Sequence, residues 1–292
     1  MDKAERGWHI GVIGGSGLAD GIGLEQAQEI TVSSPFGEPS AAVVQGRIGA
    51  VRFTFLARHG AGHRLSPASV NFRANIDVLK RCGVTDLLAL SAIGSLREEM
   101  APGHFVAVDQ LIDRTHGRAG SFFGEGLVAH VSLADPTCPR LSALAATAAR
   151  GAGATVHDAG CYVAIEGPQF STRAESRMYR AWGADVIGMT AMPEARLARE
   201  AELPYAILGM VTDYDAWRES EAGVEAAEVF AVMRANAERA RAAVRELAAL
   251  LPPEREPSPI DTALEHALAT APAQRDPQLV AKLAAVAGRV LG

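Results

Sequence analysis

The sequence predicts an α/β fold with one main domain, in which helices flank a mixed, mostly parallel central sheet. Short apolar segments typical of buried strands alternate with segments of helical periodicity along most of the chain. A strand-helix-strand order favours parallel neighbours, because the crossover helix returns the chain to the same end of the sheet. Several of the predicted strands also end in Gly, Ser, Thr or Asp, which places polar groups along one edge of the sheet.

Composition limits the classes of protein to consider. A chain of 292 residues can bury a substantial core, and its 48% hydrophobic and 21% charged residues are typical of a soluble globular protein. The net charge of -6 gives no general attraction to nucleic acid or to an anionic membrane, so neither is an expected partner. Cys82, Cys138 and Cys161 lack CxxC spacing, which indicates neither a zinc site nor a disulfide framework. With no signal-peptide core and no long apolar span, we expect a cytoplasmic protein.

The first half of the chain begins with a strand and a glycine loop. Ser66 and Pro67 have the residue types of a helix cap and first turn, and they predict a helix that ends at Gly83. Residues 113–137 show no clear periodicity, and a loop of this length is either a surface excursion or a functional or interfacial segment. The strands predicted in this half cover residues 9–13, 41–44, 51–57, 85–90 and 104–112.

In the second half, Thr172 and Glu175 form a capping-box pattern that opens a helix running to Trp182. Further helices are predicted over residues 139–150, from Pro193 onward and over 224–251, with strands over 161–165, 185–189 and 205–211. A Pro-rich connector over 252–259 precedes two segments, 262–270 and 278–291, that have helical patterns. We therefore expect one main domain, residues 1–251, and a C-terminal helical extension, residues 252–292, packed on or near it.

Polar residues at several strand ends suggest a site for an anion. The loop Gly14-Gly-Ser-Gly17 allows backbone amides and the Ser16 hydroxyl to approach a phosphate-like group, although a purely structural turn is the alternative. Arg58 suits bidentate contact with a phosphate and His59 is a further donor, but alone the pair equally fits a surface salt bridge. Ser91 and Thr190, each just past an apolar strand, complete a candidate anion cage.

A second group of residues suits a polar ring. Asp213 and Asp215 are candidates for metal ligation, for helix capping or for recognition of ring nitrogens. An acid that leaves an apolar strand is poorly hydrated and a like charge nearby raises its proton affinity, so a protonated Asp213 would be able to donate to a departing base. Phe170 would face the ring and Ser171 would bond to its edge, unless they are a core residue and a helix cap.

The motifs in this order resemble those of the trimeric purine nucleoside phosphorylases. The resemblance covers roughly residues 10–251, with a weaker trace to about residue 271, and it implies a single-domain nucleoside phosphorylase fold and a homotrimer. It is carried by Gly14-Gly-Ser-Gly17, Arg58-His-Gly60, Asn71-Phe-Arg-Ala-Asn75, Gly94-Ser-Leu-Arg97, Asp109-Gln-Leu-Ile-Asp-Arg-Thr115, Glu166-Gly-Pro-Gln-Phe170 and Met189-Thr190.

The resemblance implies phosphorolysis, in which inorganic phosphate is a co-substrate and no metal or other cofactor takes part. Phosphate attacks the anomeric carbon of the ribosyl group while the purine departs, so catalysis needs an anion site on one face and a proton donor at N7. Met189 would pack on the ribose, Asp213 would serve N7, and Asp215, Ser171 and Phe170 would complete base recognition. The implied phosphate ligands are Ser16, Arg58, His59, Ser91, Ala92 and Thr190.

Asp213 favours adenine, because family members that use 6-oxopurines typically carry Asn there. The pattern is most similar to members that convert 5′-methylthioadenosine to adenine and 5-methylthioribose 1-phosphate, in purine and methionine salvage, and 5′-deoxyadenosine is a further expected substrate. By resemblance, Ala226, Val229 and Phe230 would line the 5′ pocket together with His130 from a neighbouring subunit. Methylthioinosine or inosine phosphorolysis is the alternative within the family. A dinucleotide-binding protein is the alternative from another class, although the glycine loop lacks the last glycine of that fingerprint.

Overall fold

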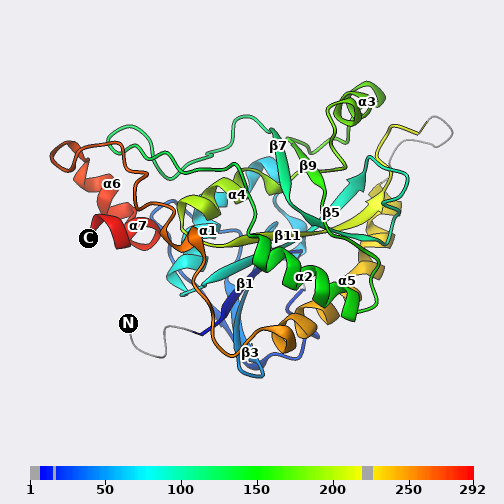
Figure 1. The fold of residues 1–292 in the computed structure, drawn as a ribbon, viewed down its shortest axis with the longest axis horizontal. Helices are drawn as coiled ribbons and strands as arrows, with labels where there is room; N and C mark the ends of the chain where they lie inside the picture. The colour runs from blue at the N-terminus through cyan, green and yellow to red at the C-terminus, as the bar shows by residue number, and fades with distance from the viewer. Residues whose placement is uncertain (1–6, 16–17, 219–225) are drawn as a thin grey trace.

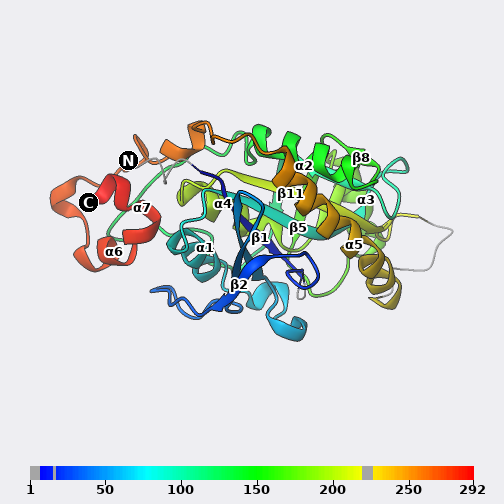
Figure 2. The same cartoon turned by 90° about the horizontal axis from the view of Figure 1, so that it is seen from below.

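The structure is a computed structural model, and it describes residues 7–15, 18–218 and 226–292, without the side chains of residues 226 and 228–231. A central sheet separates two pairs of helices (Figure 1). Helices α1 (Phe72–Arg81) and α4 (Ala191–Glu200) pack together on one face, and α2 (Pro139–Gly151) and α5 (Ala226–Leu250) pack together on the other. Figure 2 shows the second pair side by side along the sheet. No described helix is long and apolar enough to cross a membrane.

The described strands form one mixed sheet. Its main path runs β2-β3-β4-β1-β5-β10-β9-β7, while β11 joins β5 to β6 and β6 pairs with β8. The pairs β1-β4, β1-β5, β5-β11, β6-β8, β7-β9 and β9-β10 are parallel and four pairs are antiparallel, which confirms the predicted mostly parallel sheet. The bounds are β1 (His9–Gly14), β2 (Glu25–Ile30), β3 (Val43–Ile48), β4 (Val51–Ala57), β5 (Asp86–Ser95), β6 (Phe105–Val108), β7 (Gln110–Arg114), β8 (Val156–His157), β9 (Cys161–Ile165), β10 (Val186–Gly188) and β11 (Tyr205–Asp213).

Strand β5 is the junction of the sheet. Its first half pairs with β1, its last two residues pair with β10, and β11 runs along almost its whole length. The ends of these three neighbours therefore meet along the second half of β5, beside Ser91 and Gly94. In a sheet of this kind the carboxyl ends of parallel strands form the crevice that binds ligands.

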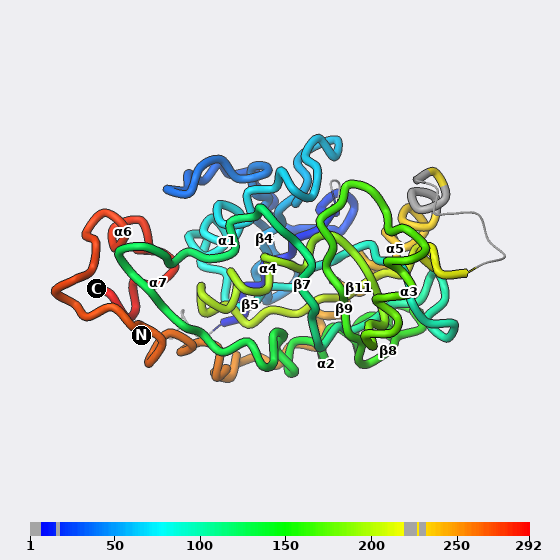
Figure 3. Tube along the Cα trace, turned by 90° about the horizontal axis from the view of Figure 1, so that it is seen from above, coloured from blue at the N-terminus to red at the C-terminus, as the bar shows by residue number. Residues whose placement is uncertain are grey.

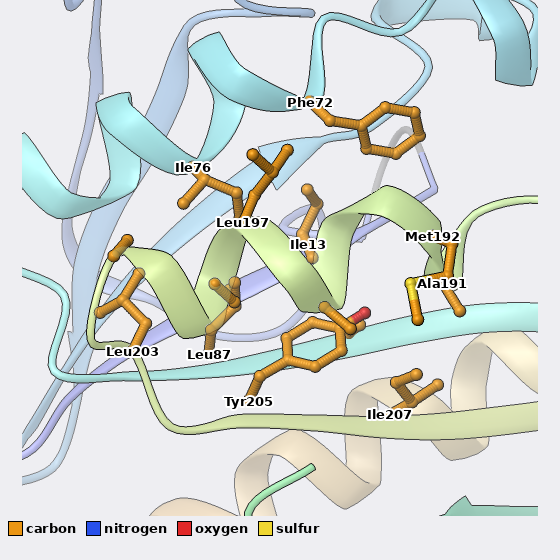
Figure 4. Packing of buried hydrophobic residues seen from close by; sticks show 14 of the residues in the cluster. Ile13, Phe72, Ile76, Leu87, Ala191, Met192, Leu197, Leu203, Tyr205 and Ile207 are labelled. Carbon is orange, nitrogen blue, oxygen red and sulfur yellow. The ribbon is translucent and has the colours of Figure 1, made fainter. Parts of the chain in front are cut away.

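Both faces of the sheet are buried, so its central strands alternate between two apolar layers. In β5, Leu87 faces the α1 and α4 layer whereas Leu88 faces the α2 and α5 layer. The period of two arises because successive side chains of a strand point to opposite faces. Figure 4 shows the first layer, with Leu87 and Tyr205 from the sheet beneath Leu197 of α4.

Several element boundaries differ from the predictions. The helix expected to open at Ser66 begins at Phe72, because Pro67–Ser69 form only a 3₁₀ turn and Val70 is extended. Asn71 caps α1 by accepting a hydrogen bond from the Ala74 backbone N–H at 3.1 Å. The strand expected over 104–112 is two strands, β6 and β7. Strands β2 and β8 were not predicted, since β2 is polar and largely exposed and β8 is two residues long.

The C-terminal residues also differ in part. Helix α3 (Arg173–Ala181) has the predicted capping box, and the end of the chain forms two short helices, α6 (Pro277–Lys282) and α7 (Ala284–Leu291). The helix expected over 262–270 is wrong, because after the 3₁₀ turn Pro259–Thr262 this segment forms turns and a β-bridge between Leu268 and Ala129. Figure 3 shows its partner, the long segment after β7, crossing the molecule to α6 and α7 before it returns to α2.

Candidate active site

A pocket of about 570 Å³ opens at the junction of β1, β4, β5, β10 and β11. It brings together residues that are far apart in the sequence because their strands end at the same edge of the sheet. Phosphate-binding and base-binding candidates share this one cavity. Those that line it are Arg58, His59, Ser91, Ala92, Phe170, Met189, Thr190, Asp213 and Asp215.

The remaining candidates lie elsewhere or outside the described part of the chain. Ser16 is not among the described residues, although its neighbour Gly15 lines the pocket. The side chains of Ala226, Val229 and Phe230 are likewise outside the description, whereas Met233 and Ala237, further along α5, line the pocket. Ser171 lies behind the lining, close to Asp215. His130 is exposed and belongs to no part of its own subunit's pocket.

Arg58 is held in a buried ion pair. Its Nε and Nη2 donate to the two carboxylate oxygens of Glu194 at 2.8 and 3.0 Å, and both side chains are almost completely buried. Nη1 donates to the Leu90 carbonyl and Nη2 to the Ile13 carbonyl, so four of the five N–H groups are used within the protein. The ion pair is therefore not a surface salt bridge. Arg58 is also not free for bidentate contact with phosphate, because only one Nη1 N–H remains for a ligand.

His59 is neutral in the empty pocket. Burial, followed by the charge of Arg58, lowers the pKa of His59 from 6.5 to about 4. Its Nδ1 lies 2.9 Å from the Leu65 carbonyl oxygen and must carry the proton, because a carbonyl can only accept. In the neutral ring Nε2 is then a hydrogen-bond acceptor, and the contact of His59 with phosphate stays a prediction.

Ser91 stands in β5, and Thr190 follows β10 and precedes α4, so the two residues come together from neighbouring elements. Their hydroxyl oxygens are 3.1 Å apart and both side chains are buried. The Thr190 backbone N–H donates to the Tyr162 hydroxyl at 3.3 Å. Gly188 permits this approach, since a Cβ there would lie 2.1 Å from the Tyr162 hydroxyl. Two adjacent hydroxyls that both face the pocket are suited to oxygens of one anion.

Asp213 ends β11 opposite Gly94 of β5, where a Cβ would approach the Asp213 carboxylate to 2.9 Å. The Asp213 Oδ1 accepts from the Asp215 backbone N–H at 2.8 Å, and Oδ2 lies 2.7 Å from the Thr212 hydroxyl. That hydroxyl also lies 3.1 Å from the Ile93 carbonyl, and its one proton can serve only one of the two acceptors. The Thr212 hydroxyl therefore lies between the Asp213 carboxyl group and the Ile93 carbonyl.

Asp215 has a raised pKa. Burial is the main cause, and the charge of Asp213 adds to it, while the hydroxyls of Ser176 and Ser171 and the Ala216 backbone N–H offset part of the rise. The raised pKa favours the neutral form of Asp215, beside the carboxyl group of Asp213. Such a pair can both donate to and accept from the edge of a heterocycle.

Phe170 and Met189 line the pocket from loops. Phe170 is 42% exposed and is therefore not a core residue. Met189 packs against Gly167, whose φ of 67° favours glycine and where a Cβ would lie 2.4 Å from the Met189 sulfur. An apolar ring and a thioether beside two carboxyl groups suit a flat, partly polar ligand.

Four residues of the site region were missed from the sequence. His63 lines the pocket with its ring stacked on His59 at 4.3 Å, and Thr212 bridges Asp213 and Ile93. Glu194 and Arg118 do not line the pocket but bind groups that do. The sequence does contain one signal of a buried ion pair, which is a charged residue inside an otherwise apolar stretch. Glu194, in the first turn of α4, is such a residue.

The Asp pair does not assemble with other metal-binding side chains. Among the described residues, no three His, Cys, Asp or Glu side chains are grouped so that they could hold a metal ion.

Comparisons with known proteins identify the family of the chain. Residues 9–249 match the family model described as Phosphorylase superfamily. S-methyl-5′-thioadenosine phosphorylases from Cereibacter sphaeroides and Bradyrhizobium diazoefficiens are 59% and 56% identical, each over 97% of this chain and 98% of its own length.

Solved structures show the same likeness. A methylthioadenosine phosphorylase from an antarctic soil metagenomic library matches with a TM-score of 0.90 and 44% identity, over 96% of this chain and 99% of its own. Methylthioadenosine phosphorylase from Schistosoma mansoni in complex with adenine matches with a TM-score of 0.78 and 38% identity, over 83% of this chain and 91% of its own. The resemblance that the motifs indicate is confirmed, and the chain belongs to the phosphorylase superfamily.

Proposed function

We propose that the protein catalyses the phosphorolysis of 5′-methylthioadenosine to adenine and 5-methylthioribose 1-phosphate. The observation that carries the proposal is the placement of an anion-binding group, Ser91 with Thr190, and an acid pair, Asp213 with Asp215, in one pocket. Along β5 they are separated by the three residues from Ser91 to Gly94, about 10 Å of strand, which leaves room for a sugar ring between phosphate and base. Relatives of 59% and 56% identity carry this activity in their names.

In this mechanism a phosphate oxygen forms a bond to the anomeric carbon as the bond from that carbon to purine N9 breaks. The electron pair of the broken bond passes into the purine, and Asp213 donates a proton or a hydrogen bond to N7, so that neutral adenine leaves. Arg58, His59, Ser91 and Thr190 hold the phosphate, with the Ala92 backbone and Ser16 contributing. The reaction is a pentosyl transfer that uses only these side chains and inorganic phosphate.

The acid at residue 213 favours adenine over 6-oxopurines. Asp213 serves N7 of the base from the end of β11, while Asp215 and Ser171 lie together nearby and receive the 6-amino group. Phe170 packs on the ring and Met189 on the ribose. We place 5′-deoxyadenosine among the substrates, since it differs only in the group that enters the 5′ pocket, which the resemblance assigns to Ala226, Val229 and Phe230.

The active assembly in this proposal is a homotrimer in which His130 enters the neighbour's 5′ pocket. The support for this assembly is the position of His130, which is exposed and does not line the pocket. Its loop is attached to the C-terminal residues, because the His130 backbone N–H donates to the Ala267 carbonyl and Ala129 forms a bridge with Leu268. Residues 1–251 would form the catalytic domain, and residues 252–292 would form an extension packed on it. Arg289 of the extension makes a bidentate ion pair with Glu202 of the domain. We place the enzyme in the cytoplasm, with nucleoside and phosphate as its partners.

The proposal is tested by the release of adenine from 5′-methylthioadenosine, followed by ultraviolet absorbance with and without phosphate. We expect release only when phosphate is present, together with 5-methylthioribose 1-phosphate in equal amount. Release that does not depend on phosphate would identify a hydrolase. Faster turnover of methylthioinosine or inosine would favour the 6-oxopurine alternative.

Replacement of the acid is the sharpest test of mechanism. Asp213→Asn should lower kcat on 5′-methylthioadenosine by about 10²- to 10⁴-fold, because the side chain can no longer transfer a proton to the departing base. Activity on methylthioinosine should fall much less. Asp158→Asn is the matched control, since Asp158 is exposed and lies outside the pocket, and it should keep wild-type rates. Equal kcat in both variants would exclude Asp213 as the donor.

The dinucleotide-binding alternative has little support. Gly15 of the glycine loop lines the same cavity as Arg58 and Ser91, so the loop contributes to the anion site and not to a separate crevice. A fluorescence titration with nicotinamide and flavin cofactors tests it directly. We expect no saturable binding in the micromolar range.

A further inference from the structure

Two loops form the nucleoside side of the pocket, and no strand pairing holds them to each other. Strands β9 and β10 run parallel, and their last paired residues are Ala164 and Gly188. Beyond these residues β9 continues into the segment that carries Phe170, and β10 continues into Met189 and Thr190. The two exits therefore need another interaction to keep a fixed separation.

Arg118, from the long segment after β7, supplies that interaction. Its Nη1 donates to the Met189 and Met192 carbonyls, each at 2.7 Å. Its Nη2 donates to the Glu166 carbonyl at 2.6 Å and to the Ile165 carbonyl at 3.4 Å, and Nε donates to the Glu166 carboxylate at 3.1 Å. All five N–H groups thus bind the two loop exits, and the planar guanidinium fixes the spacing between them.

The position of Arg118 separates this role from direct contact with a ligand. Its side chain is 3% exposed and does not line the pocket, whereas Ile165 and Met189, to which it donates, do. A lone buried guanidinium would be costly, and here one carboxylate and four carbonyl groups satisfy it. Gly167 and Met189 also pack at a distance that leaves no room for a side chain at residue 167, so a shift of one exit displaces the other.

We propose that Arg118 is a positioning residue that holds Met189 at a fixed distance from the loop of Phe170. The inference rests on the proposed function, because it assigns ribose and base to these two loops. Of the phosphate-binding candidates, Thr190 follows Met189, whereas Arg58 and His59 follow the end of β4 and Ser91 stands in β5, and these three make no hydrogen bond with Arg118. Its loss should therefore affect use of the nucleoside more than use of phosphate.

Arg118→Lys is the informative variant, because it keeps the charge but replaces a planar five-donor group by a single ammonium. We expect kcat/KM for 5′-methylthioadenosine to fall about 100-fold, the effect of displacing a reacting group by about 1 Å, with a much smaller rise in KM for phosphate. Glu166→Gln removes only the charged partner and should show a smaller loss of the same kind. Added guanidinium ion should restore part of the activity of Arg118→Ala.

Arg199→Lys is the matched control. Arg199 is buried like Arg118 and likewise donates to backbone carbonyl groups. Its acceptors are Ser132 and Asp135, in the long segment after β7, and it hydrogen-bonds to neither loop exit. It should lower the melting temperature by a similar amount and leave both KM values and kcat unchanged. Equal kinetic losses in Arg118→Lys and Arg199→Lys, or wild-type kinetics in Arg118→Lys, would overturn the proposal.

A failure of the proposed function would give a different experimental result from a failure of the Arg118 proposal. A wild-type protein that releases no adenine in the presence of phosphate contradicts the assigned reaction and leaves the geometry of Arg118 unchanged. Calorimetric titration with adenine then tests Arg118 alone. A dissociation constant that rises at least tenfold in Arg118→Lys and not in Arg199→Lys supports the positioning role, and an unchanged constant contradicts it.

Discussion

The two sides of the pocket, which we propose bind phosphate and nucleoside, are built in different ways. Arg58 directly follows β4 and Ser91 stands in β5, and they are 3% and 5% exposed, whereas Phe170 is 42% exposed and stands on a loop. The first group is held by backbone register and by a buried ion pair with Glu194. The second depends on side-chain contacts made by Arg118 from a distant segment.

This difference follows from what each ligand requires. A phosphate is small and charged, and fixed donors in a buried site bind it without reorganisation. A nucleoside is larger and must enter and leave, which favours loops at the open side of the pocket. Substitutions on the phosphate side should therefore change folding stability, and substitutions of exposed residues in the Phe170 loop should change kinetics alone.

The largest effect should come from Glu194→Ala. It leaves the charge of Arg58 buried without a counter-charge, which costs about 3–5 kcal/mol of unfolding free energy. Urea denaturation measures the loss, and the KM for phosphate should rise because Arg58 is released from its position. Glu265→Ala removes a carboxylate that pairs with Arg289 at the surface and should leave stability nearly unchanged. Similar results for both variants would contradict the contrast between the two sides.

The next effect is a pH dependence of stability that originates at His59. Its pKa in the folded protein is about 4 and its ordinary value is 6.5, so between these values the unfolded chain binds more protons. Stability is therefore fully present above pH 6.5 and is lost as the pH falls toward 4, by at most about 3 kcal/mol.

Denaturation at a series of pH values measures this slope, and His59→Asn should reduce it. A residual slope should persist in the variant, because burial also lowers the pKa of His9 to about 4. A slope that is identical in the variant and the wild type would show that His59 does not carry this effect.

The smallest effect is expected at Phe170. Phe170→Ala should raise the KM for 5′-methylthioadenosine by about 5- to 150-fold, the equivalent of about 1–3 kcal/mol of stacking, with no change in unfolding free energy or in KM for phosphate. Trp182→Ala serves as the control, since Trp182 is another exposed aromatic residue and lies outside the pocket. A loss of stability in Phe170→Ala would mean that the nucleoside side is part of the core after all.

Much of the fold was predictable because it is encoded locally. The capping box of Thr172 and Glu175 and the apolar strand Cys161–Ile165 occur where periodicity and residue type place them. The turns after residue 262 were not predictable, since Leu268 pairs with Ala129 more than a hundred residues away. Helical periodicity there is overridden by a contact that no local pattern reveals.

The candidate site shows the same division. Strand-end hydroxyls and acids are visible in the sequence, and the structure places Ser91, Thr190, Asp213 and Asp215 around one cavity. The partners of Arg58 were not visible, because Glu194 reaches it across 136 residues, and this contact changes how many donors Arg58 presents. The protonation of His59 likewise depends on burial and on the Leu65 carbonyl.

The sequence by itself determined the α/β class, the order of the strands and the residue types that surround a nucleoside and a phosphate. It did so because strand periodicity, helix caps and the residues at strand ends depend on neighbours along the chain. Only the tertiary structure decided which donors remain free, which carboxyl group holds a raised pKa and which residue holds the two loops together. Those properties depend on burial and on contacts such as that of Arg118 with Met189, which the folded chain alone creates.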